Sequence, residues 1–339
     1  MDIDSNSGNT NRPDYIKRIE RINPEKQLTD VLTKKFGQKF SDYRKEYFKI
    51  LDSKNNNYDH VPDYPLNVLV EVVNKCNLEC IMCLSSHRKG DTKVISHDTI
   101  SKLLTEFKEN NLPALMFGAG DEPLMFSDID QFWKEANSSG IMDIFIFTNG
   151  TLLNEDMCKK ILEHEVSRVY ISLDAATEET YQQIRLTNNK IHDEVKNNQN
   201  LTILNSKQNE LQSIENNIKR LIELRNSRNL QLPQIRVSYT VQSRNKHEIE
   251  MFKEKWQDVV DFIEFQETQN IQFDNLAKLS ETERWKRRPP MYKENYKKDC
   301  KAPFHSATVW SDGSVIPCCC LLYTSDAADE GLGVDLGGR

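Results

Sequence analysis

The chain has 339 residues, of which 29% are charged, and its formal net charge is −7. This length is enough for one large α/β domain and a smaller one. The acidic balance gives no general attraction to nucleic acid or to anionic membranes. No apolar run approaches the length of a membrane span, and the first residues lack a signal-peptide core. We therefore expect a cytoplasmic protein that binds neither nucleic acid nor membrane.

The N-terminal part of the chain predicts a helical extension. The first 14 residues are polar, and helical periodicity runs through residues 15–53. A stretch rich in Asn, Asp and Pro follows and indicates a linker. We expect residues 1–63 to form an N-terminal helical extension with its linker, which packs on the main domain.

Strands and helices alternate from residue 64 to residue 270. The expected strands are residues 68–73, 113–117, 142–147, 167–173, 234–241 and 259–265. The expected helices are residues 96–110, 127–139, 154–164, 177–185, about 211–228 and 247–256. Six such units predict parallel strands joined by right-handed crossovers. Periodicity alone does not distinguish an open sheet from a barrel.

Three cysteines follow the first strand with the spacing C-x3-C-x2-C: Cys76, Cys80 and Cys83. Iron–sulfur clusters are normally held by four cysteines, so three in one loop could hold a four-iron cluster and leave one iron open. A zinc site is the alternative, because His87 would complete a closed Cys3His set. Cys158, within an expected helix, is interpreted as a core residue.

Further motifs stand where the next strands end, which is where parallel α/β folds place their chemistry. Glycine turns also let the backbone approach a ligand closely. Asp174 could instead cap the helix that follows it. The three motifs are Gly118-Ala119-Gly120-Asp121-Glu122-Pro123, Thr148-Asn149-Gly150, and Ser172-Leu173-Asp174 with its continuation to Arg185.

A second group of cysteines lies near the C-terminus, at Cys300, Cys318 and Cys319. Residues 308–310 and 314–316 predict a short hairpin about a turn at 311–313. That hairpin would bring Cys300 and Cys318 together. Considered alone, this segment is also compatible with a zinc ribbon.

These motifs, in this order, resemble those of the radical S-adenosylmethionine (radical SAM) enzymes. The resemblance implies a partial (β/α)6 barrel with a 4Fe-4S cluster on Cys76, Cys80 and Cys83, whose open iron binds SAM. It also implies cofactor-binding roles for Gly118, Gly120, Asp121, Glu122, Asn149, Ser172, Asp174 and Arg185. Asp121 stands where the family commonly has a second glycine. Val241 is a candidate for contact with the adenine.

The C-terminal motif resembles the start of a SPASM domain, a module that binds auxiliary iron–sulfur clusters. The resemblance implies that Cys300, Cys318 and Cys319 are metal ligands. It divides the chain into a barrel at 64–270, a linker at 271–299 and the start of a small Cys-rich domain at 300–319. The remaining residues, 320–339, read like a translated sequencing adapter. We expect this tail to be non-native and the SPASM domain to be truncated.

The implied activity is reductive cleavage of SAM to a 5′-deoxyadenosyl radical that abstracts hydrogen from a substrate. That substrate is a small molecule, such as a sugar or aminocyclitol, or a peptide or protein. The electron donor would be a flavodoxin or a ferredoxin. The alternative function is a non-catalytic zinc-binding module that combines a Cys3His site with a zinc ribbon.

Overall fold

The computed structural model describes residues 18–52, 61–83, 91–118, 120–187, 191, 198–202, 210–267 and 301–317. Among these residues, none of the helices has the length and apolarity needed to span a bilayer.

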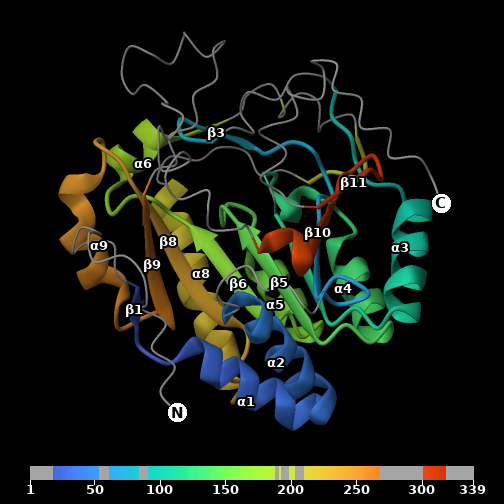
Figure 1. The fold of residues 1–339 in the computed structure, drawn as a ribbon. Coiled ribbons are helices and arrows are strands. Elements are labelled where there is room, and N and C mark those ends of the chain that lie inside the picture. Colours follow the sequence, from blue (N-terminus) through green and yellow to red (C-terminus); the bar gives the residue numbers. More distant parts are fainter. Residues whose placement is uncertain are drawn as a thin grey trace, which may run out of the picture.

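Six parallel strands form the centre of the molecule and follow one another in chain order across the sheet. Each pairs with its neighbours in parallel register, and β9 and β2 are not paired with each other. The partial, unclosed (β/α)6 arrangement expected from the sequence is confirmed (Figure 1). The strands are β2 (Asn67–Val70), β4 (Ala114–Phe117), β5 (Asp143–Thr148), β6 (Arg168–Ser172), β8 (Gln234–Val241) and β9 (Phe262–Glu267).

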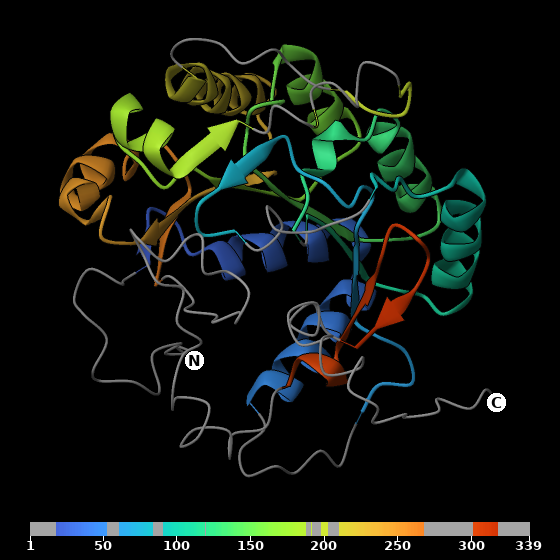
Figure 2. The same ribbon diagram turned by 90° about the horizontal axis from the view of Figure 1, so that it is seen from above.

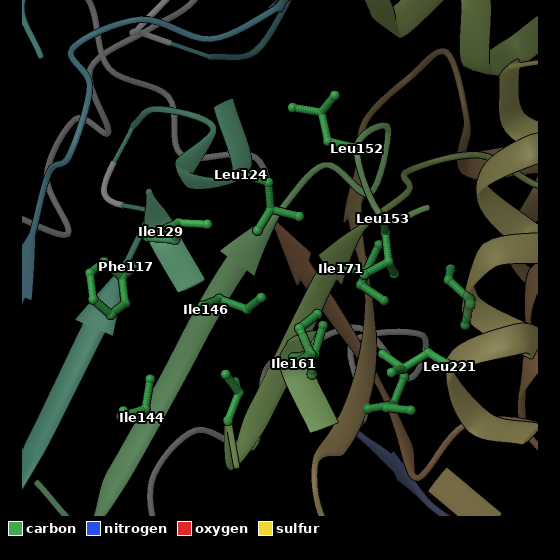
Figure 3. Packing of buried hydrophobic residues seen from close by; sticks show 14 of the residues in the cluster. Phe117, Leu124, Ile129, Ile144, Ile146, Leu152, Leu153, Ile161, Ile171 and Leu221 are labelled. Carbon is green, nitrogen blue, oxygen red and sulfur yellow. The ribbon is translucent and has the colours of Figure 1, made fainter. Parts of the chain in front are cut away.

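The helices between these strands cover one face of the sheet. They are α3 (His97–Glu109), α4 (Ile129–Ser138), α5 (Glu155–Glu163), α6 (Glu178–Ile184), α8 (Glu210–Ser227) and α9 (Ile249–Trp256). The N-cap of α3 is Ser96, whose hydroxyl accepts from the backbone amide of Thr99. Alternate strand residues such as Ile146 and Ile171 pack against helix residues such as Ile161 and Leu221 (Figure 3). Cys158 is fully buried in this core, as expected.

The opposite, inner face of the sheet carries a separate set of side chains. Phe145, Phe147, Tyr170 and Phe262 form an aromatic cluster there. Toward the carboxyl ends of the strands the inner face becomes polar. Ser172 is the register partner of Ser238, and Ser238 that of Glu264. The inner face thus has an aromatic lower part and a polar upper part.

The N-terminal segment supplies β1 (Ile19–Glu20), α1 (Pro24–Phe36) and α2 (Gln38–Asp52). Strand β1 pairs antiparallel with β9. The two helices lie across the lower end of the sheet in Figure 1, where the strands begin. Leu28, Leu32 and Phe40 pack there with Ala114 and Met142 from the starts of β4 and β5. The predicted helical extension therefore closes the amino-terminal end of the barrel.

The predicted C-terminal hairpin is present as β10 (Ser306–Val309) and β11 (Val315–Ile316), preceded by the 3-10 turn η5 (Ala302–Phe304). Its first strand pairs in parallel with β2 and so extends the barrel sheet. In Figure 2 the hairpin lies beside β2, above α2. The ring of His305 contacts that of Tyr47 on α2, with centroids 5.2 Å apart.

Two expected strand boundaries differ from the structure by three residues, and the others differ by no more than two. The first strand ends at Val70, because the chain then turns to pair Val73 with Val94. The last strand begins at Phe262 rather than at Val259. Both Val259 and Val260 donate backbone hydrogen bonds to Trp256, which continues the turn at the end of α9. Short 3-10 turns also occur at η2 (Pro123–Met125) and η3 (Lys246–Glu248).

Candidate functional site

The cysteine loop lies across the carboxyl ends of the barrel strands (Figure 1). Its strand β3 (Leu78–Cys80) pairs antiparallel with β7 (Arg185–Thr187), so that Cys80 is the partner of Arg185. The amide of Cys83 donates to the carbonyl of Cys80 at 2.9 Å, which closes a tight turn between the two cysteines. Cys80 is buried, and Cys76 and Cys83 are half-buried.

The environment of these thiols is unfavourable for an isolated thiolate. Burial raises the pKa of Cys80 to about 12 and that of Cys76 well above its usual range. Each thiolate would also repel its neighbour, since the charge of Cys80 contributes to the shift at Cys76. The nearby Arg185 cation acts in the opposite direction at Cys80. Bound metal would compensate these negative charges, because coordination deprotonates a thiol.

A ring of three hydrogen bonds fixes the polar groups beside Cys76. Asn149 Nδ2 donates to Asn77 Oδ1 at 2.8 Å, and Asn77 Nδ2 donates to Thr151 Oγ1 at 2.8 Å. The Thr151 hydroxyl completes the ring by donating to Asn149 Oδ1 at 2.6 Å. The side-chain nitrogen of Asn149, Nδ2, also donates to Cys76 Sγ at 3.5 Å. The predicted residues Cys76 and Asn149 are therefore in contact.

Glu122 joins the end of β4 to the end of β5. Its carboxylate accepts from the Thr148 hydroxyl and from the backbone amide of Asn149, each at 2.7 Å. It also accepts from the backbone amide of Leu124 at 3.2 Å. Burial raises the pKa of Glu122 to about 7, against the effect of these donors. Glu122 lies next to the predicted site, but protein groups occupy both of its oxygens.

Arg185 and Asp174 form a buried ion pair. The guanidinium donates to Asp174 Oδ2 through Nε at 3.2 Å and through a terminal nitrogen at 2.6 Å. Asp174 has a φ of 60°, and its Oδ1 accepts from the amide of Thr240 at 2.6 Å. The structure thus brings together two of the predicted residues and ties them to the end of β8.

The alternative role of Asp174 as a helix cap is wrong. The N-cap of α6 is Thr177, whose hydroxyl accepts from the amide of Thr180. Glu248 supports this turn by accepting from the amides of Ala176 and Thr177 at 2.7 and 3.2 Å. Asp174 instead serves the ion pair and the end of β8.

The remaining predicted residues line the same edge of the sheet. Gly118 has a φ of 96°, and a Cβ there would lie 2.4 Å from the carbonyl oxygen of Phe147. This position consequently requires glycine. The amide of Gly120 donates to Asp121 Oδ1 at 3.3 Å. Ser172 and Val241 stand at the ends of β6 and β8.

Ser238 was not predicted from the sequence. It stands beside Ser172 on the inner face, and its buried hydroxyl has no hydrogen-bond partner among the described residues. Asn77, Thr151 and Glu248 were missed as well. Asn77 directly follows the first cysteine and Thr151 directly follows the Asn-Gly turn, so proximity to a motif could have indicated both. Nothing in the sequence links Glu248 to the turn at residues 174–177.

Some of the predicted metal ligands lie outside the described residues: His87, Cys300, Cys318 and Cys319. Within the described ranges, no three His, Cys, Asp or Glu side chains converge in a way that could hold a metal ion. The zinc alternative for the first loop depends on His87.

Comparison with known families identifies the region that contains this site. Residues 70–201 match the radical SAM superfamily. This stretch is a radical SAM domain. It includes the three cysteines, Glu122, Asn149 and the Asp174–Arg185 pair.

Curated relatives match parts of the chain. A 7,8-dihydro-6-hydroxymethylpterin dimethyltransferase of Methanocaldococcus jannaschii is 31% identical over 116 residues, 33% of this chain and 23% of that protein. A tungsten-containing aldehyde ferredoxin oxidoreductase cofactor-modifying protein of Pyrococcus furiosus is 31% identical over 106 residues, 31% of this chain and 30% of that protein. A GTP 3′,8-cyclase of Limosilactobacillus fermentum is 30% identical over 131 residues, 38% of each chain. The match thus spans well under half of these relatives.

Solved structures with a similar arrangement are more distant in sequence. BtrN in complex with AdoMet and 2-DOIA is 15% identical, covering 78% of this chain and 76% of that one, with a TM-score of 0.42. Streptococcus suis SuiB bound to its precursor peptide SuiA is 13% identical, covering 84% and 64%, with a TM-score of 0.43. Native anSMEcpe with bound AdoMet is 17% identical, covering 75% and 74%, with a TM-score of 0.48. Nothing about the substrate of this chain follows from these likenesses.

Proposed function

We propose that this protein is a radical SAM enzyme of the SPASM type. Its cysteine loop would hold a 4Fe-4S cluster through Cys76, Cys80 and Cys83. When bound, the cluster and SAM together supply a 5′-deoxyadenosyl radical that abstracts hydrogen from the substrate. The protein's part is to bind, orient and exclude water.

The observation that carries this proposal is the setting of the cysteine loop within a radical SAM domain. Pairing of β3 with β7 holds Cys80 at the carboxyl ends of the strands. The side-chain amide of Asn149 donates to Cys76, and the Arg185 cation lies near Cys80. Hydrogen-bond donors and positive charge beside sulfur favour thiolate ligands of an iron–sulfur cluster.

The groups that would hold SAM differ in part from the expected ones. Arg185 already pairs with Asp174, and Glu122 already accepts three hydrogen bonds. We therefore assign these three residues to positioning the loops around SAM. The backbone at Gly118 and Gly120, with Asp121 and the hydroxyl of Ser172, would contact it, and Val241 would flank the adenine. Ser238 joins this set because its buried hydroxyl has no partner among the described residues.

The polar upper part of the inner face supports a small-molecule substrate. Glu264 pairs with Arg236, whose guanidinium stacks on Tyr170 at 3.9 Å. Arg236 Nε is buried without a partner within the described part of the chain. Arg236 and Glu264 offer both donors and acceptors with no net charge, which suits hydroxyl and amino groups. A sugar or aminocyclitol fits them better than a peptide does.

The other parts of the proposal rest on the sequence. We infer that the chain is cytoplasmic and that a flavodoxin or ferredoxin reduces it. Residues 1–63 would be the helical extension, 64–270 the barrel and 271–299 a linker. Residues 300–319 would begin a SPASM domain with auxiliary iron–sulfur clusters on Cys300, Cys318 and Cys319. Residues 320–339 would be non-native.

Formation of 5′-deoxyadenosine tests this function. The protein is reconstituted anaerobically with iron and sulfide, then given SAM and dithionite, and the product is quantified by chromatography. We expect product from the wild type and none from Cys80→Ala, with Cys158→Ala as the matched control because that cysteine lies in the helix-facing core. The proposal fails if iron is not retained, or if zinc copurifies stoichiometrically and no product forms. The second result would support a non-catalytic zinc module.

A further inference from the structure

The side-chain amide of Asn149 has only one orientation that satisfies its neighbours. Asn149 Oδ1 accepts from the backbone amide of Thr151 at 2.9 Å and from the Thr151 hydroxyl at 2.6 Å. If the side-chain amide were turned over, its nitrogen would face the backbone N–H of Thr151, and two donors would meet without an acceptor. The nitrogen of Asn149 must therefore point the other way, toward Cys76 and Asn77.

Both hydrogens of that nitrogen are used. One is donated to Asn77 Oδ1 at 2.8 Å and the other to Cys76 Sγ at 3.5 Å. A second donor, the backbone amide of Leu78, lies 3.4 Å from the same sulfur. Asn149 and Asn77 are both buried. A hydrogen bond is electrostatically stronger in such surroundings than in water.

The backbone of Asn149 is fixed as well. Its amide donates to Glu122 at 2.7 Å, so the turn after β5 is anchored to the loop after β4. Because both the backbone and the side chain are held, the donor keeps its direction toward Cys76 whether or not the sulfur carries negative charge. Such a donor needs no rearrangement when the charge on the sulfur changes.

We propose that Asn149 is a positioning residue that sets the reduction potential of the cluster through its hydrogen bond to Cys76 Sγ. This inference rests on the proposed function, because it requires a cluster on the cysteine loop. Hydrogen bonds to the ligand sulfurs are among the factors that set the potential of an iron–sulfur cluster. A donor stabilises the more negative, reduced state and so makes reduction easier.

A potentiometric titration of the reconstituted protein, followed by electron paramagnetic resonance, tests this role. Asn149→Leu has a similar size and removes the donor, so we expect its midpoint potential to shift to a more negative value. Thr151→Val is the matched control. It removes both ring bonds of the Thr151 hydroxyl. The backbone amide at 151 still donates to Asn149 Oδ1 and orients Asn149, so the potential should stay at the wild-type value. Equal potentials in wild type and Asn149→Leu, or equal shifts in both variants, would overturn the proposal.

A second variant keeps the test decisive if Asn149→Leu does not take up iron. Asn149→Asp retains the acceptor for Thr151 and replaces the donor by an oxygen, so its potential should also be more negative than that of the wild type. In the wild type, double-resonance spectra of the reduced cluster should show couplings to two exchangeable protons at Cys76 Sγ, from Asn149 and from the Leu78 amide. The coupling from Asn149 should be absent from either variant, and the coupling from Leu78 should remain. If both variants fold by circular dichroism but retain no iron, the role is assembly and this proposal is wrong. Failure of the wild type itself to form a cluster would instead refute the proposed function.

Discussion

At the scale of single residues, two buried glutamates show how partners decide the charge of a carboxyl group. Glu122 accepts three hydrogen bonds, yet burial dominates and raises its pKa to about 7. Glu248 is also buried, which alone would raise its pKa. The hydroxyls of Thr177 and Thr180 and two backbone amides reverse the effect, and the pKa of Glu248 is lowered. The two groups should therefore influence stability in opposite pH directions.

The first prediction concerns Glu122. Its pKa is near 7 in the folded protein and near the ordinary 4.5 when unfolded, so the folded state binds more protons between these values. The free energy of unfolding should fall as pH rises from about 4.5 to 7, by about 3 kcal/mol in total. In the metal-free Glu122→Gln variant this pH-dependent fall in the free energy of unfolding should disappear. Urea unfolding at pH 5 and pH 8 measures it.

The control for that experiment is Glu248→Gln. Glu248→Gln should lose a pH dependence of the free energy of unfolding that has the opposite sign. A lowered pKa in the folded state contributes stability that disappears as pH falls. Equal pH dependence in wild type and Glu122→Gln would show that the carboxyl group does not titrate in this range.

The sequence located most of these residues but not their partners. Glu122, Asn149, Asp174 and Arg185 were all singled out because their motifs resemble those of the radical SAM enzymes, and all lie at one edge of the sheet. Their mutual hydrogen bonds could not be predicted. Whether Arg185 turns toward Asp174 depends on the path of α6 and on the positive φ of Asp174, which spacing does not encode.

At the scale of secondary-structure elements, the short pairing of β3 with β7 holds the cysteine loop, and the Arg185–Asp174 pair anchors β7. We predict that Arg185→Met lowers the free energy of unfolding by roughly 3–5 kcal/mol, because it leaves Asp174 as an unpaired buried charge. The double variant Arg185→Met/Asp174→Asn should lose less than the sum of the two single variants. Chemical denaturation of the metal-free protein gives all three values. Strict additivity would mean that the ion pair is energetically unimportant.

Long, periodic elements were predicted well, whereas the short strands β1, β3 and β7 were not predicted. The apolar stripe of α8 and the alternation in β8 follow directly from the order of residues. Strands β1, β3 and β7 have two or three residues each, too few for a period to be recognisable. Each exists only because a partner far away in the chain completes it.

At the scale of the whole molecule, α1 and α2 close the lower end of the barrel through their own apolar cluster. Phe40 is fully buried there, so Phe40→Ala should destabilise the protein by roughly 3–5 kcal/mol. Met251→Ala on α9 is the control. This methionine is 49% exposed, and its loss should change stability by no more than about 0.5 kcal/mol. If both variants unfold at the same temperature as the wild type, the N-terminal helices do not contribute to the stability of the barrel.

The parallel pairing of β10 with β2 has a consequence for synthesis on the ribosome. Val70 meets Val309, which is translated about 240 residues later. At a translation rate of about 5–20 residues per second, that delay is on the order of tens of seconds. Throughout it, one side of β2, the strand that leads into the cysteine loop, has no neighbour. The nascent chain therefore presents this loop before β10, the neighbour of β2 in the folded sheet, has been synthesised.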